Sequence, residues 1–287
     1  MRVSITSDIH FTHFRRPMDA VDALQTAMSE DKPDIFVVAG DITQGVASGK
    51  EPAIDALLGS QTGAYFVLGN HDLWGRGDQK LDPPTAMDKY MKVYYNVGNP
   101  LEKSWGDKDT FYTIGDTAIV GSMGFPDFTH PNFKHRVKKL NSEGTTNDVS
   151  YMRILPLGWL HFTEPMNRAF LSRLDKAVES GAKKVVVVSH YAMFDGQCIV
   201  GYDEIAPYFF NHLPGQTLLE IARRHKDVEF WCLSGHSHEY SRDELKMESE
   251  NVYVYGCAGG YGQAVLYTFD TELGMNQERK GRVVLDR

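Results

Sequence analysis

Short apolar runs rich in β-branched and aromatic residues recur along the chain, and each ends abruptly at Gly, Asp, Asn or His. Runs of this length are typical of buried β-strands. The clearest of them cover residues 3–6, 35–39, 64–68, 185–188, 230–233 and 252–255. Amphipathic segments separate several runs, for example where Leu171, Leu174 and Val178 recur at helical spacing. This alternation predicts an α/β fold with helices packed outside a mixed or parallel sheet.

The length of 287 residues fits one large layered domain, so we expect residues 1–287 to form a single domain. The segment 126–165 breaks the alternation, because it carries four prolines and a basic cluster without clear periodicity. That cluster consists of Lys134, Arg136, Lys138 and Lys139. We expect an insertion at about 126–165. It is either a functional loop or a surface excursion with a short hairpin, and the sequence leaves both open.

Charge and hydropathy narrow the range of partners. The net charge of -8, without a long block of like charge, argues against nucleic acid as a partner. A strand-like run begins almost at Met1, which leaves no room for a signal peptide, and no stretch approaches about 18 consecutive apolar residues. We therefore expect a cytoplasmic protein without a membrane partner. The cysteines Cys198, Cys232 and Cys257 lack metal-site spacing, and we expect reduced, buried thiols.

The polar residues that follow the strands carry the functional information. In open α/β sheets, ligands gather beyond the carboxyl ends of the strands, so side chains that follow different strands should converge. We also expect residues two apart in an extended chain to point to the same side. The polar residues that follow the first five strands, in order, are Asp8 and His10, Asp41, Asn70 and His71, His190, and His236 and His238.

These carboxylates and imidazoles, with one amide oxygen and no thiolate, suit two divalent or trivalent metal ions such as Mn, Fe or Zn. Two metals about 3.5–4 Å apart need a bridging ligand, and Asp41 is our candidate. Taken alone, each histidine could be an ordinary hydrogen-bonded residue, and the Asp41 and Asn70 segments could be simple turns. Together, five groups at five predicted strand ends favour a metal site.

The order of these motifs resembles the complete five-block signature of the calcineurin-like metallophosphoesterases. The blocks are Asp8-Ile9-His10, Gly40-Asp41, Gly69-Asn70-His71-Asp72, His190 and Gly235-His236-Ser237-His238. The resemblance implies a four-layer α/β/β/α sandwich, in which two mixed β-sheets are flanked by helices and the dimetal site lies at the sandwich edge.

The resemblance also implies a role for each residue. It places Asp8, His10 and His238 on one metal, and Asn70, His190 and His236 on the other. Asp41 would bridge the two ions. Asn70 and His71 would contact the substrate, and His71 would bind the phosphoryl group or act as the general acid. The nucleophile would be a hydroxide held between the two metals.

The sequence departs from some branches of this family. Protein Ser/Thr phosphatases carry a further Asp and Arg in the second block, where this chain reads Ile42-Thr43-Gln44-Gly45, and Glu in place of Asp72. That activity is disfavoured, and the residue that orients His71 stays unassigned. Lipid A precursor hydrolases carry Arg at the position of His71, so that activity is also disfavoured.

We expect a phosphatase or phosphodiesterase that acts on a small-molecule or nucleotide phosphoester. The alternatives are a nuclease of the DNA-repair exonuclease type and, less favoured, a non-catalytic metal-binding scaffold. The native metal, the physiological substrate and the oligomeric state are left open. Several aromatic residues either line a base or sugar pocket or close a local core, namely Trp74, Phe125, Phe128 and Phe133.

Overall fold

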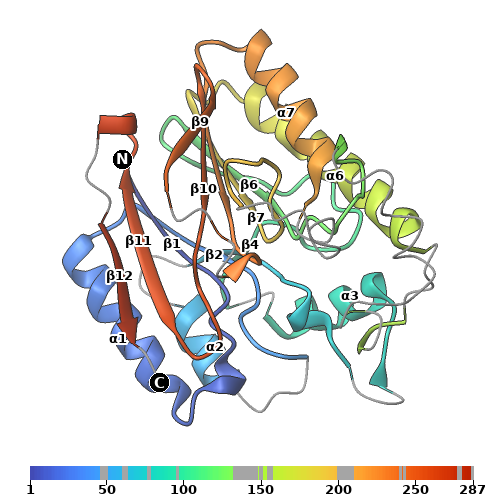
Figure 1. Cartoon of the computed structure of the whole chain (residues 1–287), viewed down its shortest axis with the longest axis vertical. Helices are drawn as coiled ribbons and strands as arrows, with labels where there is room; N and C mark the ends of the chain where they lie inside the picture. The colour runs from blue at the N-terminus through green and yellow to red at the C-terminus, as the bar shows by residue number, and fades with distance from the viewer. Residues whose placement is uncertain are drawn as a thin grey trace.

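Two six-stranded mixed sheets form the centre of the protein (Figure 1). The computed structural model describes residues 1–45, 51–59, 64–75, 79–94, 97–131, 148, 151–153, 158–198, 210–238, 241, 244–276 and 280–285. The first sheet has the order β12 (Lys280–Leu285), β11 (Ala264–Asp270), β1 (Arg2–Thr6), β2 (Ile35–Ala39), β3 (Tyr65–Val67) and β4 (Asn99–Pro100). The second has the order β5 (Tyr112–Ile114), β6 (Thr117–Ser122), β7 (Lys184–Ser189), β8 (Glu229–Ser234), β10 (Val252–Gly256) and β9 (Lys246–Ser249).

Parallel strands occupy the middle of each sheet. In the first sheet β1, β2, β3 and β4 run parallel, and β11 and β12 add antiparallel strands at one edge. In the second sheet β6, β7, β8 and β10 run parallel, and β5 and β9 pair antiparallel at the two edges. The carboxyl ends of the central strands in each sheet therefore lie at one rim.

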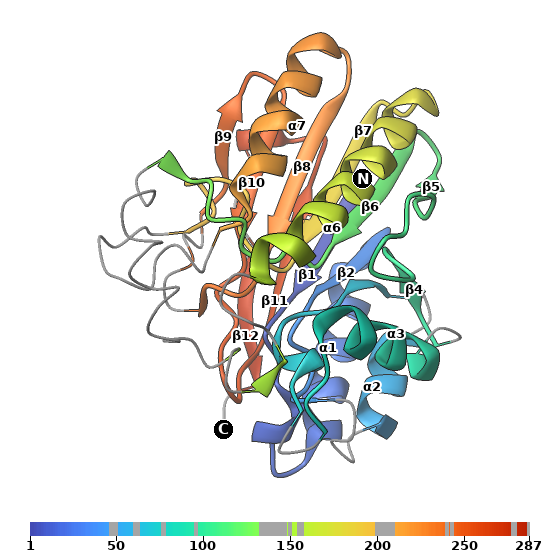
Figure 2. The ribbon, with the colours of Figure 1, turned by 90° about the vertical axis from the view of Figure 1, so that its right-hand side faces the viewer.

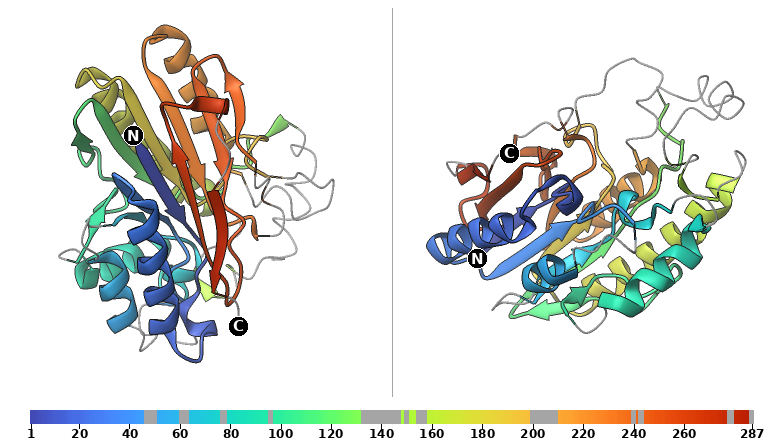
Figure 3. Two further views of the ribbon diagram at one scale, coloured as in Figure 1. Left: turned by 90° about the vertical axis from the view of Figure 1, so that its left-hand side faces the viewer. Right: turned by 90° about the horizontal axis from the view of Figure 1, so that it is seen from below.

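Helices cover the outer face of each sheet (Figures 2 and 3). The helices α1 (Pro17–Asp31), α2 (Glu51–Leu58) and α3 (Pro83–Tyr94) share a buried core with the first sheet. The helices α6 (Gly158–Glu179) and α7 (His212–Arg224) share a second core with the other sheet. Three short 3₁₀ turns complete the described elements, namely η1 (Phe11–His13), η2 (His71–Leu73) and η7 (Gly274–Asn276).

The alternation of side chains along β2 explains why its sequence is apolar throughout. Phe36 and Val38 pack against the helices, whereas Val37 and Ala39 belong to the core between the two sheets. Successive side chains of a strand point to opposite faces, so a strand buried on both faces needs an unbroken apolar run. β7 follows the same rule, and the three separate cores confirm the predicted α/β/β/α arrangement.

Helix α6 begins inside the segment that the sequence analysis treated as an irregular insertion. It starts at Gly158 and contains Pro165, which removes one backbone hydrogen bond. Burial of Met166, Phe170 and Leu174 outweighs this loss, so the proline does not end the helix. The single-domain assignment and the insertion at 126–165 stay predictions. The basic cluster Lys134, Arg136, Lys138 and Lys139 and the aromatic Phe133 lie outside the described residues.

Other predictions about the chain have different outcomes. All three cysteines are buried, as expected. Within the described part of the chain, the helices are too short or too polar to cross a bilayer. A cytoplasmic location stays a prediction.

Candidate metal centre

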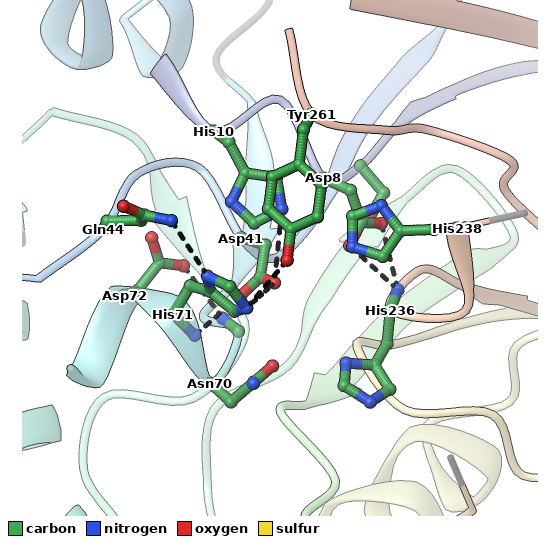
Figure 4. Close-up of polar contacts among 12 residues, drawn as sticks. Asp8, His10, Asp41, Gln44, Asn70, His71, Asp72, His236, His238 and Tyr261 are labelled. Carbon is green, nitrogen blue, oxygen red and sulfur yellow. Dashed lines mark hydrogen bonds and ion pairs between the residues drawn. The ribbon is translucent and has the colours of Figure 1, made fainter. Parts of the chain in front are cut away.

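The polar residues predicted at the strand ends come together at one rim, where loops from both sheets meet (Figure 4). Asp8 and His10 follow β1, and Asp41 follows β2. Backbone hydrogen bonds join these two loops, from Asp8 N–H to Gly40 O at 3.1 Å and from His10 N–H to Asp41 O at 3.0 Å. The assignment of these residues as metal ligands stays a prediction. The distances between their side chains and the chemistry of their ligand atoms bear on it.

One group of possible ligand atoms belongs to Asp8, His10, Asp41 and His238, and these atoms all lie within 4.8 Å of one another. The Nε2 atom of His10 is 3.7 Å from Oδ2 of Asp41, and Nε2 of His238 is 3.4 Å from Oδ1 of Asp8. Three of the four residues are buried and His238 is partly exposed. A cation held by this group would therefore sit just beneath the surface.

A second group contains Asp41, His190 and His236, again within 4.8 Å. The Nε2 atom of His190 is 3.4 Å from Oδ1 of Asp41, 3.2 Å from Nδ1 of His236 and 2.9 Å from Oδ1 of Asn70. The other ring nitrogen of His190 donates to Ala39 O at 2.8 Å, which directs Nε2 into the group. Asp41 alone belongs to both groups, which is the position that a bridging carboxylate requires.

Several buried polar atoms of the first group have no hydrogen-bond partner within the described part of the chain. They include both ring nitrogens of His10 and the Oδ2 atom of Asp41. Buried polar atoms are almost always paired, and an unpaired cluster calls for a missing partner such as an ion. Gaps of 3.4 to 3.9 Å between imidazole nitrogens and Asp41 oxygens are too long for good hydrogen bonds. The donor set fits two divalent cations.

The backbone is strained at most of the candidate ligands. Asp8, His10, Asp41, His236 and His238 all have positive φ, between 45° and 67°. Elsewhere in the described residues only Lys32 and Phe128 among non-glycine residues do so. Such conformations cost roughly 1–3 kcal/mol each and gather at functional sites. The expectation that extended backbone aligns Asp8 with His10 is therefore wrong, because left-handed turns beyond the strands bring these side chains together.

Close packing of glycines against ligands explains the glycines of the motifs. Gly40 has φ +85°, and a Cβ atom there would lie 2.6 Å from Nδ1 of His190.

Asp72, the last residue of the third motif, holds the ligand loops in place. Its carboxylate accepts hydrogen bonds from the backbone N–H groups of Thr43 at 2.8 Å and Gly69 at 2.9 Å, which ties two ligand loops together. Burial raises the pKa of Asp72 to about 7.

In the metal-free protein, burial and the charge of Asp41 together determine the pKa values of the candidate ligands. Burial lowers the pKa of His10 and that of His236 well below the usual value. Burial acts in the same direction on His190, but the carboxylates of Asp41 and Asp8 outweigh it and raise its pKa to about 9. Desolvation alone would raise the pKa of Asp41, yet the surrounding histidines hold it well below the usual value. Asp41 is thus a permanent anion at the centre of the site.

His71 lies beside the two groups without belonging to either. Its backbone N–H donates to Oδ1 of Asp41 at 2.9 Å, and its Nε2 atom is 3.9 Å from Oδ2 of the same carboxylate. Burial lowers the pKa of His71 to about 4, so the ring is neutral in the metal-free protein at neutral pH. The Nε2 edge of the ring faces the site. Its contact with substrate stays a prediction.

Two neighbours of His71 were missed by the sequence analysis. The Nε2 atom of Gln44 is 3.4 Å from Nδ1 of His71. On the other side, the hydroxyl of Tyr261 is 3.4 Å from Nε2 of His71. The Tyr261 ring stacks on His10 and His238, with centroids 4.4 Å and 4.7 Å apart. The sequence signal for Tyr261 is an aromatic residue between glycines just after a buried strand.

Trp74 and Tyr151 form one wall of a cavity next to His71. The indole of Trp74 stacks on His71 with centroids 3.5 Å apart, and Tyr151 stacks on Trp74 at 4.4 Å. The cavity has a volume of about 470 Å³, and its polar lining includes Thr12, Gln44, Gln79 and Lys89. Of the other aromatics considered, Phe125 is fully buried and Phe128 packs partly buried against the same core, so both close a local core.

A known family model and several solved structures are similar to this chain. The sequence model described as calcineurin-like phosphoesterase matches residues 1–240. No curated protein sequence matches significantly.

Similar solved structures include GAP50, the anchor in the inner membrane complex of Plasmodium, at 12% identity, covering 99% of this chain and 84% of that one, with a TM-score of 0.46. Another is the sulfate thiohydrolase SoxB of Thermus thermophilus in complex with glycerol, at 14% identity, covering 98% of this chain and 56% of that one, with a TM-score of 0.49. A third is a phosphatase of Mycoplasma pneumoniae, at 10% identity, covering 99% of this chain and 93% of that one, with a TM-score of 0.43.

Proposed function

The chain belongs to the calcineurin-like phosphoesterase family, as its motif order predicted, and from this premise we propose that it is a metal-dependent hydrolase of small-molecule or nucleotide phosphoesters. The observation that carries the proposal is the buried, unpaired set of donor atoms around Asp41. Asp8, His10 and His238 would hold one cation, and Asn70, His190 and His236 the other. Asp41 would bridge them.

Two bound cations would supply Lewis acidity towards phosphoryl oxygens and a water acidified to near neutrality. The protein residues then have separate tasks. Asn70 and His71 contact the phosphoryl group at the open side of the site. Gln44 donates through its amide nitrogen to Nδ1 of His71, so the proton of the neutral ring lies on Nε2, the nitrogen that faces the substrate. The neutral His71 ring can therefore donate a hydrogen bond to a phosphoryl oxygen. To act as the general acid the ring must first gain a second proton, which a bound anionic phosphoester would favour.

The cavity beside His71 supports a small substrate. Its volume of about 470 Å³ lies within the range of ligand pockets, which is roughly 300–1,000 Å³. Aromatic and polar residues line it, with Lys89 at α3 as a cation for an anionic substituent. The net charge of -8 disfavours an extended nucleic acid. We assign the cavity to the non-phosphoryl part of the substrate.

Metal removal tests the central claim. Chelated protein should lose hydrolysis of para-nitrophenyl phosphate or its bis ester, and Mn²⁺ should restore it. Metal analysis of the restored protein should give two ions per chain. Full activity in the chelated, metal-free protein would refute the mechanism, and two bound ions without hydrolysis of any tested phosphoester would favour the scaffold alternative.

A substrate screen with matched variants tests the cavity. Cyclic nucleotides, nucleoside monophosphates and polyphosphates should be compared with the nitrophenyl esters. Lys89→Glu should raise the KM for substrates with a second anionic group more than for nitrophenyl phosphate. Lys92→Glu is the control, because Lys92 lies one turn further along α3 and outside the cavity lining. It should change the KM for neither class of substrate. Cleavage of DNA in preference to all small esters would instead favour the nuclease alternative.

A further inference from the structure

A buried carboxylate outside the predicted ligand set contacts the site. Asp148 is 6% exposed, and its Oδ1 atom accepts two hydrogen bonds. One comes from Nδ2 of Asn70 at 2.8 Å and the other from Nε1 of Trp74 at 2.7 Å. No ligand role for this residue follows from the motifs, because it lies far from all five of them in the sequence.

The contact with Asn70 determines which end of its amide enters the site. An amide has an accepting oxygen at one end and a donating nitrogen at the other, and only the oxygen can bind a cation. With its nitrogen bound to Asp148, Asn70 presents Oδ1 to the second group, 2.9 Å from Nε2 of His190. The flipped amide would place its oxygen against a carboxylate and its N–H groups against the cation. Both contacts would be repulsive.

The same carboxylate oxygen also fixes Trp74. Its bond to Nε1 sets the orientation of the indole, whose ring stacks on His71 at a centroid distance of 3.5 Å. Asp148 therefore contacts the candidate ligand Asn70 directly and also contacts Trp74, which stacks on the candidate acid His71.

We propose that Asp148 is a positioning residue that holds the Asn70 amide with its oxygen towards the second metal position and holds Trp74 against His71. This inference rests on the proposed dimetal function. It assigns to Asp148 no contact with substrate or metal, only control over the orientation of groups that have such contacts. Partners of this kind are typically worth about 10- to 100-fold in metal affinity or activity.

Titration of the metal-free protein with Mn²⁺ by calorimetry tests the proposal. Asp148→Leu should weaken one of two binding events by about 10- to 100-fold and leave the other unchanged. Its kcat should fall with little change in KM at saturating Mn²⁺. Trp74→Phe is the matched control, since it removes only the indole donor and keeps the bond between Asn70 and Asp148. Its two Mn²⁺ affinities should stay at the wild-type values.

Exchanging the side chains of residues 70 and 148 distinguishes control of the amide orientation from a general loss of structure. Asn70→Asp alone sets two carboxylates against each other and should lose metal. The double variant Asn70→Asp/Asp148→Asn restores a complementary pair, because the new amide can donate to the new carboxylate while the other carboxylate oxygen faces the metal. The double variant should therefore bind the second Mn²⁺ at least tenfold more tightly than Asn70→Asp.

A readout without metal comes from the indole N–H signal of Trp74 in NMR spectra, which Trp74→Phe identifies. This signal should shift in Asp148→Leu. Unchanged Mn²⁺ affinities in a folded Asp148→Leu protein, or an exchange variant no better than Asn70→Asp, would overturn the proposal. If the wild-type protein itself fails to bind two Mn²⁺ ions, the proposed dimetal function is wrong. That outcome is distinguishable from a failure of the Asp148 proposal, which concerns only the variants.

Discussion

The side-chain amide nitrogen of Gln44 lies 3.4 Å from Nδ1 of His71, on the ring edge opposite the one that faces Asp41. The sequence analysis left the partner of His71 unassigned, because the Asp that orients the corresponding His in protein phosphatases has no evident counterpart in this chain. An amide supports a neutral imidazole, whereas a carboxylate would favour the charged ring. His71 and Gln44 therefore form a neutral pair beside an anionic metal site.

His71→Ala separates proton donation from metal binding. If His71 donates a proton to the leaving oxygen, its loss matters most for a poor leaving group. The variant should keep both metals and lose roughly 10² or more in rate on an alkyl or nucleoside phosphoester. The loss on a nitrophenyl ester should be distinctly smaller. Equal losses on both esters would mean that His71 binds the phosphoryl group instead, and loss of metal would make it a ligand.

Gln44→Leu tests whether Gln44 acts through His71. Its rate on the alkyl ester should fall by less than in His71→Ala, and the double variant should be no slower than His71→Ala alone. Gln25→Leu changes an exposed glutamine of α1 outside the cavity lining and serves as the control. Additive losses in the double variant would show that Gln44 has an independent role.

Asp41→Asn tests the bridging assignment. Asp41 belongs to both candidate groups, whereas His10 belongs to one. Loss of the carboxylate charge should therefore lower the affinity for both ions, and His10→Ala should lower the affinity for one of them. We expect Asp41→Asn to retain less metal and less activity than His10→Ala, as measured by elemental analysis and by hydrolysis of nitrophenyl phosphate. An Asp41→Asn protein with two metals and the wild-type rate would contradict the bridge.

Tyr261 offers two separable contributions. Tyr261→Phe keeps the ring that stacks on His10 and His238 but removes the hydroxyl next to His71. If that hydroxyl binds the phosphoryl group, kcat should fall about 10- to 100-fold, the range for a hydrogen bond to a charged group. Metal content should not change. Tyr261→Ala should also release metal more readily. Wild-type kcat in the Phe variant would exclude the hydroxyl from catalysis.

A buried ion pair away from the metals should control stability. Arg173 and Glu102 are each 1% exposed, with Nη2 3.4 Å from Oε2. Removing one partner of such a pair leaves an uncompensated charge and costs about 3–5 kcal/mol. Arg173→Met should lower the free energy of unfolding in urea by about this amount. Adding Glu102→Gln should restore much of it, and failure to do so would show that the charge pair is not the cause.

The pH dependence of Arg173→Met follows from Glu102. Burial raises the pKa of Glu102, and the charge of Arg173 opposes that rise. Without Arg173 the folded pKa rises further, so the folded variant retains a proton that the unfolded chain has already lost. Stability then falls as pH increases above the unfolded pKa, about 4.5. The stability deficit relative to wild type should thus be larger at pH 8 than at pH 5. A constant deficit would contradict this.

The sequence predicted the parts of the protein that depend on local patterns. The buried strands that precede Asp8, Asp41 and His190 could be recognised because apolar runs and the polar residues after them are contiguous. The contacts of Tyr261 and Asp148 could not be recognised, because tertiary packing alone brings these residues to the rim. The left-handed backbone at Asp8 and His10 was also missed, since non-glycine residues rarely adopt it and no sequence pattern marks it.

Five candidate ligands have positive φ angles, which aspartate and histidine adopt only at a steric cost. Glycine adopts such angles without steric cost, and asparagine tolerates them better than most residues. Random mutagenesis followed by selection for heat resistance alone should consequently enrich these two residues at positions 8, 10, 41, 236 and 238. Glycine would remove a ligand atom from the rim, and asparagine would replace a carboxylate or an imidazole with a neutral amide oxygen. The chain carries aspartate and histidine there in spite of the backbone. The most heat-resistant variants from such a selection should therefore be inactive ones.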